Sequence, residues 1–135
     1  MTTHERPTIL VVEDDRATRE MYEYALRVEG FEVSLASDGF SALRLLEHEL
    51  PDAIVLDLDL PHVSGIDVQQ EVLAHAETSA IPIIVATGTD WKTSAGVFQI
   101  LRKPITPDVL IAVVRKALSP ADGTLPSDHA RRRRT

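Results

Sequence analysis

The stretch that decides the fold is "AIVLDLDLPHVSG", residues 53–65, in which an apolar run ends in two aspartates. Residues 53–56 are apolar, as in a strand that is buried on both faces. Asp57 and Asp59 follow, and Pro61 then breaks the pattern. A carboxylate at the end of a buried strand loses hydration, so it needs a partner that compensates for this loss.

Similar apolar runs recur along the chain and alternate with segments of helical periodicity. We expect strands at residues 8–13, 31–36, 52–57, 81–87 and 97–103, and helices at residues 16–30, 37–50, 65–76 and 106–119. Strands that alternate with helices are typical of a parallel sheet with helices on both faces. The sequence therefore predicts an α/β fold with a five-stranded, doubly wound parallel sheet.

The ends of two predicted helices carry recognisable signals. Asp15 is expected to cap the first helix, and Gly30 is expected to end it. Thr106 is expected to cap the last helix, with Pro107 in its first turn. Between the fourth and fifth strands, residues 88–96 have no defined pattern.

Length and composition limit the class of protein. The chain has 135 residues, of which 44% are hydrophobic, and this is enough for one domain with a core. It has no apolar run near the ~20 residues that cross a bilayer, and its first residues lack the pattern of a secretory signal. The absence of cysteine excludes disulfides and thiolate metal sites. We expect a cytoplasmic protein without membrane insertion.

The charge of the chain is unevenly distributed. The formal net charge is −7, although four arginines stand at residues 131–134, so the remainder carries −11. Such an acidic body disfavours direct nucleic-acid binding, because that binding needs cationic contacts to phosphates. The arginine run is expected to be a solvated tail.

Polar side chains gather where the predicted strands end. The first strand ends in Glu13, Asp14 and Asp15, the third in Asp57 and Asp59, the fourth in Thr87 and Gly88, and the fifth in Lys103 and Pro104; all of these except Gly88 and Pro104 have polar side chains. Ligands of such folds bind at the carboxyl ends of the strands. Crowded carboxylates repel one another unless a cation neutralises them, and Mg²⁺ prefers oxygen ligands of this kind. The metal, the Lys103 ammonium and the Thr87 hydroxyl together would form a site for a phosphoryl group.

In these motifs the sequence resembles the receiver domain of bacterial two-component response regulators, the CheY-like family. The resemblance rests on "ILVVEDD", "IVLDLDLPHVSG", "IIVATG" and "RKPI", and on separations of 43 residues from Asp14 to Asp57 and 30 from Asp57 to Thr87. It covers residues 8–119, which leaves residues 1–7 as an N-terminal tail and 120–135 as a disordered C-terminal tail. It implies a flavodoxin-like sheet with strand order 2-1-3-4-5.

The resemblance also implies how the chain takes part in signalling. Asp57 would accept a phosphoryl group from the phosphohistidine of a sensor histidine kinase or a histidine phosphotransfer protein. Asp14 would bind Mg²⁺ directly, Glu13 would act mainly through bound water, and Asp59 would contribute its backbone carbonyl. The chain would be a phosphoacceptor rather than an enzyme, although it supplies catalytic groups to its own phosphorylation and dephosphorylation.

Three further positions take expected roles from the resemblance. Thr87 and Lys103 would bind phosphoryl oxygens, and the peptide bond between Lys103 and Pro104 would be cis. Gly65 would adopt a backbone conformation that other residues resist.

The sequence departs from the family pattern between the fourth and fifth strands. Only 16 positions separate Thr87 from Lys103, fewer than in a typical member, so we expect a shortened or irregular fourth helix. Ile100 stands where the family usually carries a tyrosine or phenylalanine. We therefore expect phosphorylation to change residues 88–102 less than in other receivers.

Two alternative functions remain open. The chain could be a degenerate receiver that acts only as a binding module, or a phosphatase of the haloacid-dehalogenase type, whose D-x-D motif resembles Asp57 and Asp59. That phosphatase family places its nucleophile on the first strand and its paired acids downstream, whereas Glu13 and Asp14 lie upstream here. With no effector domain after residue 119, we expect a stand-alone receiver that signals through protein contacts or phosphorelay.

Overall fold

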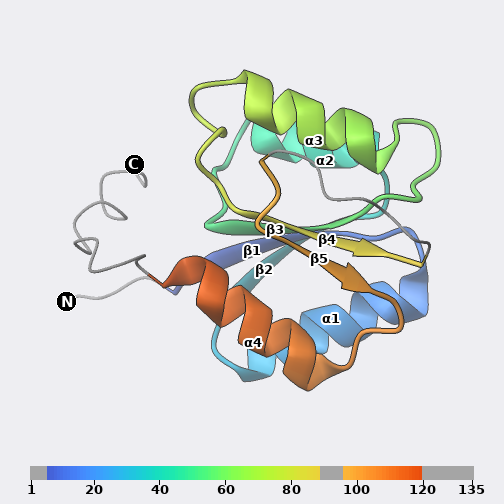
Figure 1. The fold of residues 1–135 in the computed structure, drawn as a ribbon, viewed down its shortest axis with the longest axis vertical. Coiled ribbons are helices and arrows are strands. Elements are labelled where there is room, and N and C mark those ends of the chain that lie inside the picture. Colours follow the sequence, from blue (N-terminus) through green and yellow to red (C-terminus); the bar gives the residue numbers. More distant parts are fainter. Residues whose placement is uncertain (1–5, 89–95, 120–135) are drawn as a thin grey trace.

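The computed structural model describes residues 6–88 and 96–119 (Figure 1). Five parallel strands form one sheet in the order β2-β1-β3-β4-β5, as expected. The strands are β1 (Thr8–Val12), β2 (Glu32–Ala36), β3 (Ala53–Asp57), β4 (Ile83–Thr87) and β5 (Gln99–Arg102). The described helices are α1 (Arg16–Val28), α2 (Gly39–Leu46), α3 (Gly65–Ala74) and α4 (Pro107–Leu118). None of these helices is both long and apolar enough to span a bilayer.

Helices cover both faces of the sheet, with α1 and α4 on one side and α2 and α3 on the other (Figure 1). The side chains of β1 alternate between the two layers, because successive residues of a strand point to opposite faces. Ile9 and Val11 pack in the cluster under α1 and α4, and Leu10 and Val12 pack in the cluster under α2 and α3. The strands are therefore apolar at nearly every position, as a sheet covered on both faces requires.

The strand register brings the carboxyl ends of β1, β3, β4 and β5 to one edge of the sheet. Val12 of β1 pairs with Leu56 of β3, so the residues that follow each of them emerge at the same level. Asp57 pairs with Ala86 of β4, and Thr87 pairs with Arg102 of β5. The polar residues at the ends of these strands are thus neighbours, although they are far apart in the chain.

The predicted capping residue Asp15 and terminating residue Gly30 of α1 are confirmed, although the helix ends at Val28 rather than at residue 30. The Asp15 side chain accepts a hydrogen bond from the Thr18 backbone N–H at 2.9 Å. Gly30 has a φ of 96°, the left-handed conformation that commonly terminates a helix.

The predictions for two other helices were wrong in part. The second helix was expected to reach residue 50, but α2 ends at Leu46. After Leu46 the backbone tightens, because the N–H groups of Glu47 and His48 donate to carbonyls three residues earlier, at Arg44 and Leu45. Thr106 does occupy the N-cap position of α4 with Pro107 after it, but its side chain makes no capping hydrogen bond.

Strand β5 is shorter than predicted: it begins at Gln99 rather than at residue 97 and ends at Arg102 rather than at residue 103. The predicted irregular fourth helix falls on residues 89–95, which lie outside the described residues. The predicted C-terminal tail, residues 120–135, and residues 1–5 of the N-terminal tail also lie outside them.

Gly65 is required for a reason other than the one predicted. Its φ is not left-handed, and His62 is the residue of this loop with a positive φ, at 66°. A Cβ atom on Gly65 would lie 2.4 Å from the Asp57 carbonyl oxygen and 2.5 Å from the Leu58 Cα. The start of α3 thus packs directly on the backbone at the end of β3, and only glycine fits there.

We predict that Gly65→Ala lowers the free energy of unfolding by about 2 kcal/mol or more, because the clashing atoms belong to the backbone and cannot rotate away. Gly88→Ala is the matched control, since a Cβ there has nothing within 4 Å. Urea denaturation of both variants tests this. Equal losses in the two variants would contradict the packing argument.

Candidate functional site

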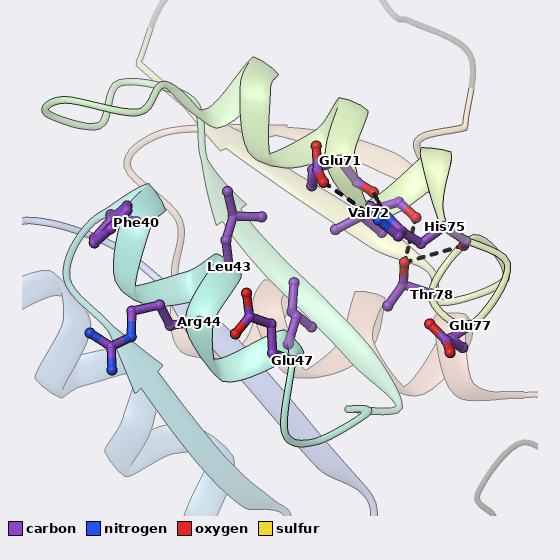
Figure 2. Close-up of a pocket in the computed structure, with 10 residues that line it drawn as sticks. Phe40, Leu43, Arg44, Glu47, Glu71, Val72, His75, Glu77 and Thr78 are labelled. Carbon is purple, nitrogen blue, oxygen red and sulfur yellow. Dashed lines mark hydrogen bonds and ion pairs between the residues drawn. The ribbon is translucent and has the colours of Figure 1, made fainter.

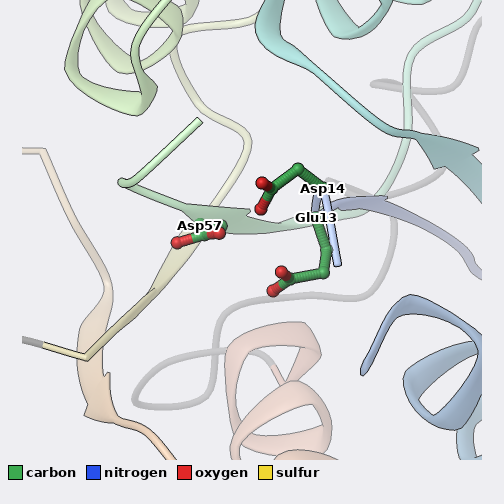
Figure 3. Close-up of side chains that lie close together, drawn as sticks. All are labelled: Glu13, Asp14 and Asp57. Atoms are coloured by element: carbon green, nitrogen blue, oxygen red, sulfur yellow. The ribbon is translucent and has the colours of Figure 1, made fainter. Parts of the chain in front are cut away.

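Three carboxylates converge at the carboxyl edge of the sheet (Figure 3). Glu13 and Asp14 follow β1, and Asp57 ends β3. One oxygen from each carboxylate lies within 4.8 Å of the others. Glu13 and Asp57 are almost fully buried, whereas Asp14 is exposed. The cluster thus has a buried floor and one side open to solvent.

Lys103 places a positive charge inside this cluster. Its Nζ lies 2.9 Å from Glu13 Oε1 and 3.4 Å from Asp57 Oδ2. Its backbone N–H donates to the Thr87 carbonyl at 2.7 Å, which fixes the end of β5 against β4. The peptide bond from Lys103 to Pro104 is cis, as the resemblance implied. Burial disfavours the ammonium, but the hydrogen bond to Glu13 and the charges of Asp57 and Glu13 raise the pKa of Lys103.

Burial and the nearby Glu13 carboxylate disfavour ionisation of the Asp57 carboxyl. Its pKa is raised to about 6, chiefly because burial disfavours the charged form, and the nearby Glu13 adds to this effect. The Asp59 backbone N–H donates to Asp57 Oδ1 at 3.0 Å and opposes the shift, as does Lys103. The N–H and the ammonium contact different oxygens, so together they fix the orientation of the carboxylate.

The remaining predicted site residues lie around this cluster. Thr87 is buried at the end of β4, beside β3 in the sheet. Asp59 is exposed, and its carboxylate does not belong to the group of three that could hold a metal. The structure therefore brings Glu13, Asp14, Asp57 and Lys103 together, with Thr87 on the adjoining strand.

Two residues of α1 also bear on the site, and sequence reasoning gave them no part in it. The Arg19 guanidinium donates to the carbonyls of Glu13 and Asp14. Tyr22 is fully buried, and burial raises the pKa of its hydroxyl to about 12, with Lys103 opposing the shift and Glu13 adding to it. The helical spacing predicted that Tyr22 lies in the core. For Arg19, the available signal was a basic residue in the first turns of the helix that follows Glu13 and Asp14.

A separate hollow lies between α2 and α3, with a volume of about 370 Å³ (Figure 2). Apolar side chains such as Leu43 and Val72 line it together with Glu47, Glu71 and Glu77. None of the three clustered carboxylates lines this hollow. It is therefore distinct from the site at the strand ends.

The response regulator receiver domain model matches residues 9–115 of this chain, a range that includes Glu13, Asp14, Asp57, Thr87 and Lys103. The chain belongs to the response regulator receiver domain family. Its members are phosphorylation-accepting domains of two-component signalling. The CheY-like identification made from the sequence motifs is thus confirmed.

Curated relatives of this receiver include response regulators of mycobacteria. Response regulator MprA of Mycobacterium sp. (strain KMS) is 37% identical over 124 residues, which cover 85% of this chain and 53% of the relative. Response regulator MprA of Mycobacterium avium is 36% identical over 128 residues, which cover 90% of this chain and 54% of the relative. The receiver thus spans about half the length of the curated relatives that it matches.

Solved structures with similar folds include two receivers from other bacteria. The chemotaxis response regulator CheY4 of Vibrio cholerae has a TM-score of 0.77 at 26% identity, over 84% of this chain and 100% of that one. The receiver domain of a sensor histidine kinase from Pseudomonas aeruginosa has a TM-score of 0.78 at 29% identity, over 84% of this chain and 98% of that one. The Pseudomonas structure has a magnesium ion coordinated in its active-site cleft.

We predict that Asp57→Asn stabilises the metal-free receiver at pH 7.5 by about 1–2 kcal/mol. The native pKa of about 6 exceeds the usual 3.8, so the folded state binds the proton more tightly than the unfolded state does. Ionised Asp57 therefore costs stability above pH 6, and this cost disappears as the pH falls toward 4. Urea denaturation in EDTA across this range measures the difference.

Asp67→Asn serves as the control, because Asp67 is a carboxylate in the first turn of α3 outside the cluster. It should give no gain at pH 7.5. A gain from Asp57→Asn that does not shrink toward pH 4 would contradict the assigned cause.

Proposed function

We propose that the protein accepts a phosphoryl group on Asp57 from a phosphohistidine partner, in a Mg²⁺-dependent reaction. The observation that carries this proposal is the position of the Asp57 carboxylate, buried between the Lys103 ammonium at 3.4 Å and the other two carboxylates within 4.8 Å. A nucleophile in this setting has a cation on one side and a set of hard oxygen ligands on the other.

The residues present fit a divalent cation. Three carboxylates share the cluster, and Lys103 supplies one positive charge, so the local charge remains negative. No described side chain donates a hydrogen bond to the Asp14 carboxylate, which leaves its oxygens available. Small hard cations with oxygen ligands suit such a donor set. Asp14 and Asp57 would hold Mg²⁺ directly, with the Asp59 carbonyl, and Glu13 would act through water.

When bound, Mg²⁺ would neutralise the negative charge of the phosphoryl oxygens and of the acid cluster. The chain's own residues orient the reaction. The Asp59 N–H and Lys103 hold the Asp57 carboxylate, one oxygen of which attacks phosphorus in line with the histidine nitrogen. The new O–P bond forms as the N–P bond breaks, and the electron pair of that bond returns to the imidazole. Lys103 and the Thr87 hydroxyl would then bind phosphoryl oxygens.

Phosphorylation would act as a switch through local charge. A phosphoryl group on Asp57 would compete with Glu13 for the Lys103 ammonium and would attract the Thr87 hydroxyl, so the ends of β4 and β5 would respond. Output would pass through protein contacts or through phosphate relay to a further protein.

The surface between α1 and α4 would suit a protein partner. An open groove of about 510 Å³ there is lined mostly by apolar side chains, including Met21 and Ile111. Tyr24 and Val28, both on α1, line this groove and are 73% and 62% exposed. Exposed apolar groups that gather on one surface are typical of protein interfaces. A helix of the phosphodonor would suit this groove.

We predict that the protein takes up one phosphoryl group per chain from acetyl phosphate in the presence of Mg²⁺, and none in EDTA. Asp57→Asn should abolish the uptake, because it removes the nucleophilic oxygen, whereas Asp67→Asn should leave it unchanged. Intact-protein mass spectrometry measures the gain in mass.

This mass measurement, together with an assay of phosphate release from a generic phosphoester, separates the alternative functions. A folded protein that gains no mass would support a binding module without phosphoacceptance. Many turnovers on a generic phosphoester would support a phosphatase of the haloacid-dehalogenase type. Either outcome would overturn the proposal.

A further inference from the structure

The acid loop, residues 13–15, connects β1 to α1 and carries two of the three clustered carboxylates. Glu13 is held at its side chain, because Oε1 contacts Lys103 and Oε2 accepts from the Asp15 N–H at 3.1 Å. Asp14 is different. No other described side chain or backbone group hydrogen-bonds its carboxylate, and the residue is exposed. The position of the Asp14 carboxylate therefore depends on its backbone.

Arg19 holds that backbone from the first turns of α1. One guanidinium nitrogen, Nη1, donates to the Glu13 carbonyl at 3.0 Å and lies 3.3 Å from the Asp14 carbonyl. These carbonyls belong to the two peptide planes that flank Asp14. Because φ and ψ of a residue describe how its two flanking planes are rotated, a single contact with both planes restrains both angles. The direction of the Asp14 Cα–Cβ bond follows from them.

The contacts of Arg19 differ from those of an ordinary surface arginine. Arg16, one turn earlier, is exposed and forms an ion pair with Glu20 at 3.0 Å. Arg19 is partly buried and, within the described part of the chain, pairs with no carboxylate. Its guanidinium donates to backbone carbonyls instead. A hydrogen bond from a charged donor to a carbonyl is stronger than one from a neutral donor.

We infer that Arg19 is a positioning residue that sets the Asp14 carboxylate for the metal ion. The inference rests on the proposed function, because it assigns Asp14 to Mg²⁺. Groups that orient metal ligands from behind commonly contribute a factor of ten or more to metal affinity. Arg19 does this through the main chain rather than through the carboxylate itself.

The sign of the effect distinguishes positioning from simple electrostatics. Arg19 carries a positive charge near an acidic cluster, so removing that charge alone would tighten Mg²⁺ binding. Loss of a positioning contact would weaken it. Arg19→Met removes both the charge and the contact, whereas Arg16→Met removes a charge from the same helix and leaves the acid loop untouched.

We predict that Arg19→Met weakens Mg²⁺ binding by about tenfold in isothermal titration calorimetry. Arg16→Met should bind Mg²⁺ as the unchanged protein does, or slightly more tightly. Arg19→Lys keeps the charge but replaces the planar guanidinium with a single ammonium, and its affinity should lie between these values. The Lys variant also provides the test if Arg19→Met fails to fold, as judged by thermal unfolding.

A second measurement needs no metal. Hydrogen exchange of the Asp15 amide, which donates to Glu13, should be faster in Arg19→Met than in Arg16→Met when both are in EDTA. Unchanged or tighter Mg²⁺ binding by Arg19→Met, or equal exchange in the two variants, would overturn the inference. If the unchanged protein itself binds no Mg²⁺, the proposed function fails, and the exchange comparison still decides whether Arg19 holds the acid loop.

Discussion

The ion pair of Lys103 with Glu13 and Asp57 is the interaction on which the site depends. It joins the ends of β1, β3 and β5, three strands that are far apart in the chain, through one ammonium group. Without a cation, buried carboxylates at these distances would repel one another and would favour their protonated forms. Lys103 offsets only part of this repulsion and burial, because the pKa of Asp57 is still raised to about 6. A further cation at this edge of the sheet would therefore be stabilised by the carboxylates.

The fold fixes the positions of these charged groups through strand register and backbone packing. Parallel register sets the ends of β1, β3, β4 and β5 at one level, and the buried apolar strands make that register difficult to change. The start of α3 lies so close to the end of β3 that only a glycine fits at position 65. Arg19 of α1 donates hydrogen bonds to the backbone of the loop that carries Asp14. The carboxylates are thus placed by backbone packing from two neighbouring elements as well as by their own contacts.

Much of this could be predicted from the sequence, because it depends on local periodicity and on one rule for parallel sheets. The apolar runs identified the strands, and the acids that follow them identified the edge where ligands bind. Contacts between distant residues were harder to predict. Gly65 is required by its close approach to the β3 backbone and not by an unusual φ, and a tertiary contact of this kind has no local sequence signal. Arg19 contacts backbone carbonyls before α1, and because every residue has a carbonyl, the sequence does not show which ones it reaches. The N-cap prediction at Thr106 was wrong in its hydrogen bond, because the Thr106 side chain hydrogen-bonds the Asp108 carboxylate instead of a backbone N–H of the first turn.

The most direct test is to locate a bound divalent cation by the paramagnetic broadening that Mn²⁺, used in place of Mg²⁺, causes in the amide spectrum. The account predicts that substoichiometric Mn²⁺ first broadens the amides of residues 13–15, 57–59 and 103, and that excess Mg²⁺ restores them. Broadening that instead centres on Glu47, Glu71 and Glu77 between α2 and α3, or that is absent at Asp14 and Asp57, would contradict it.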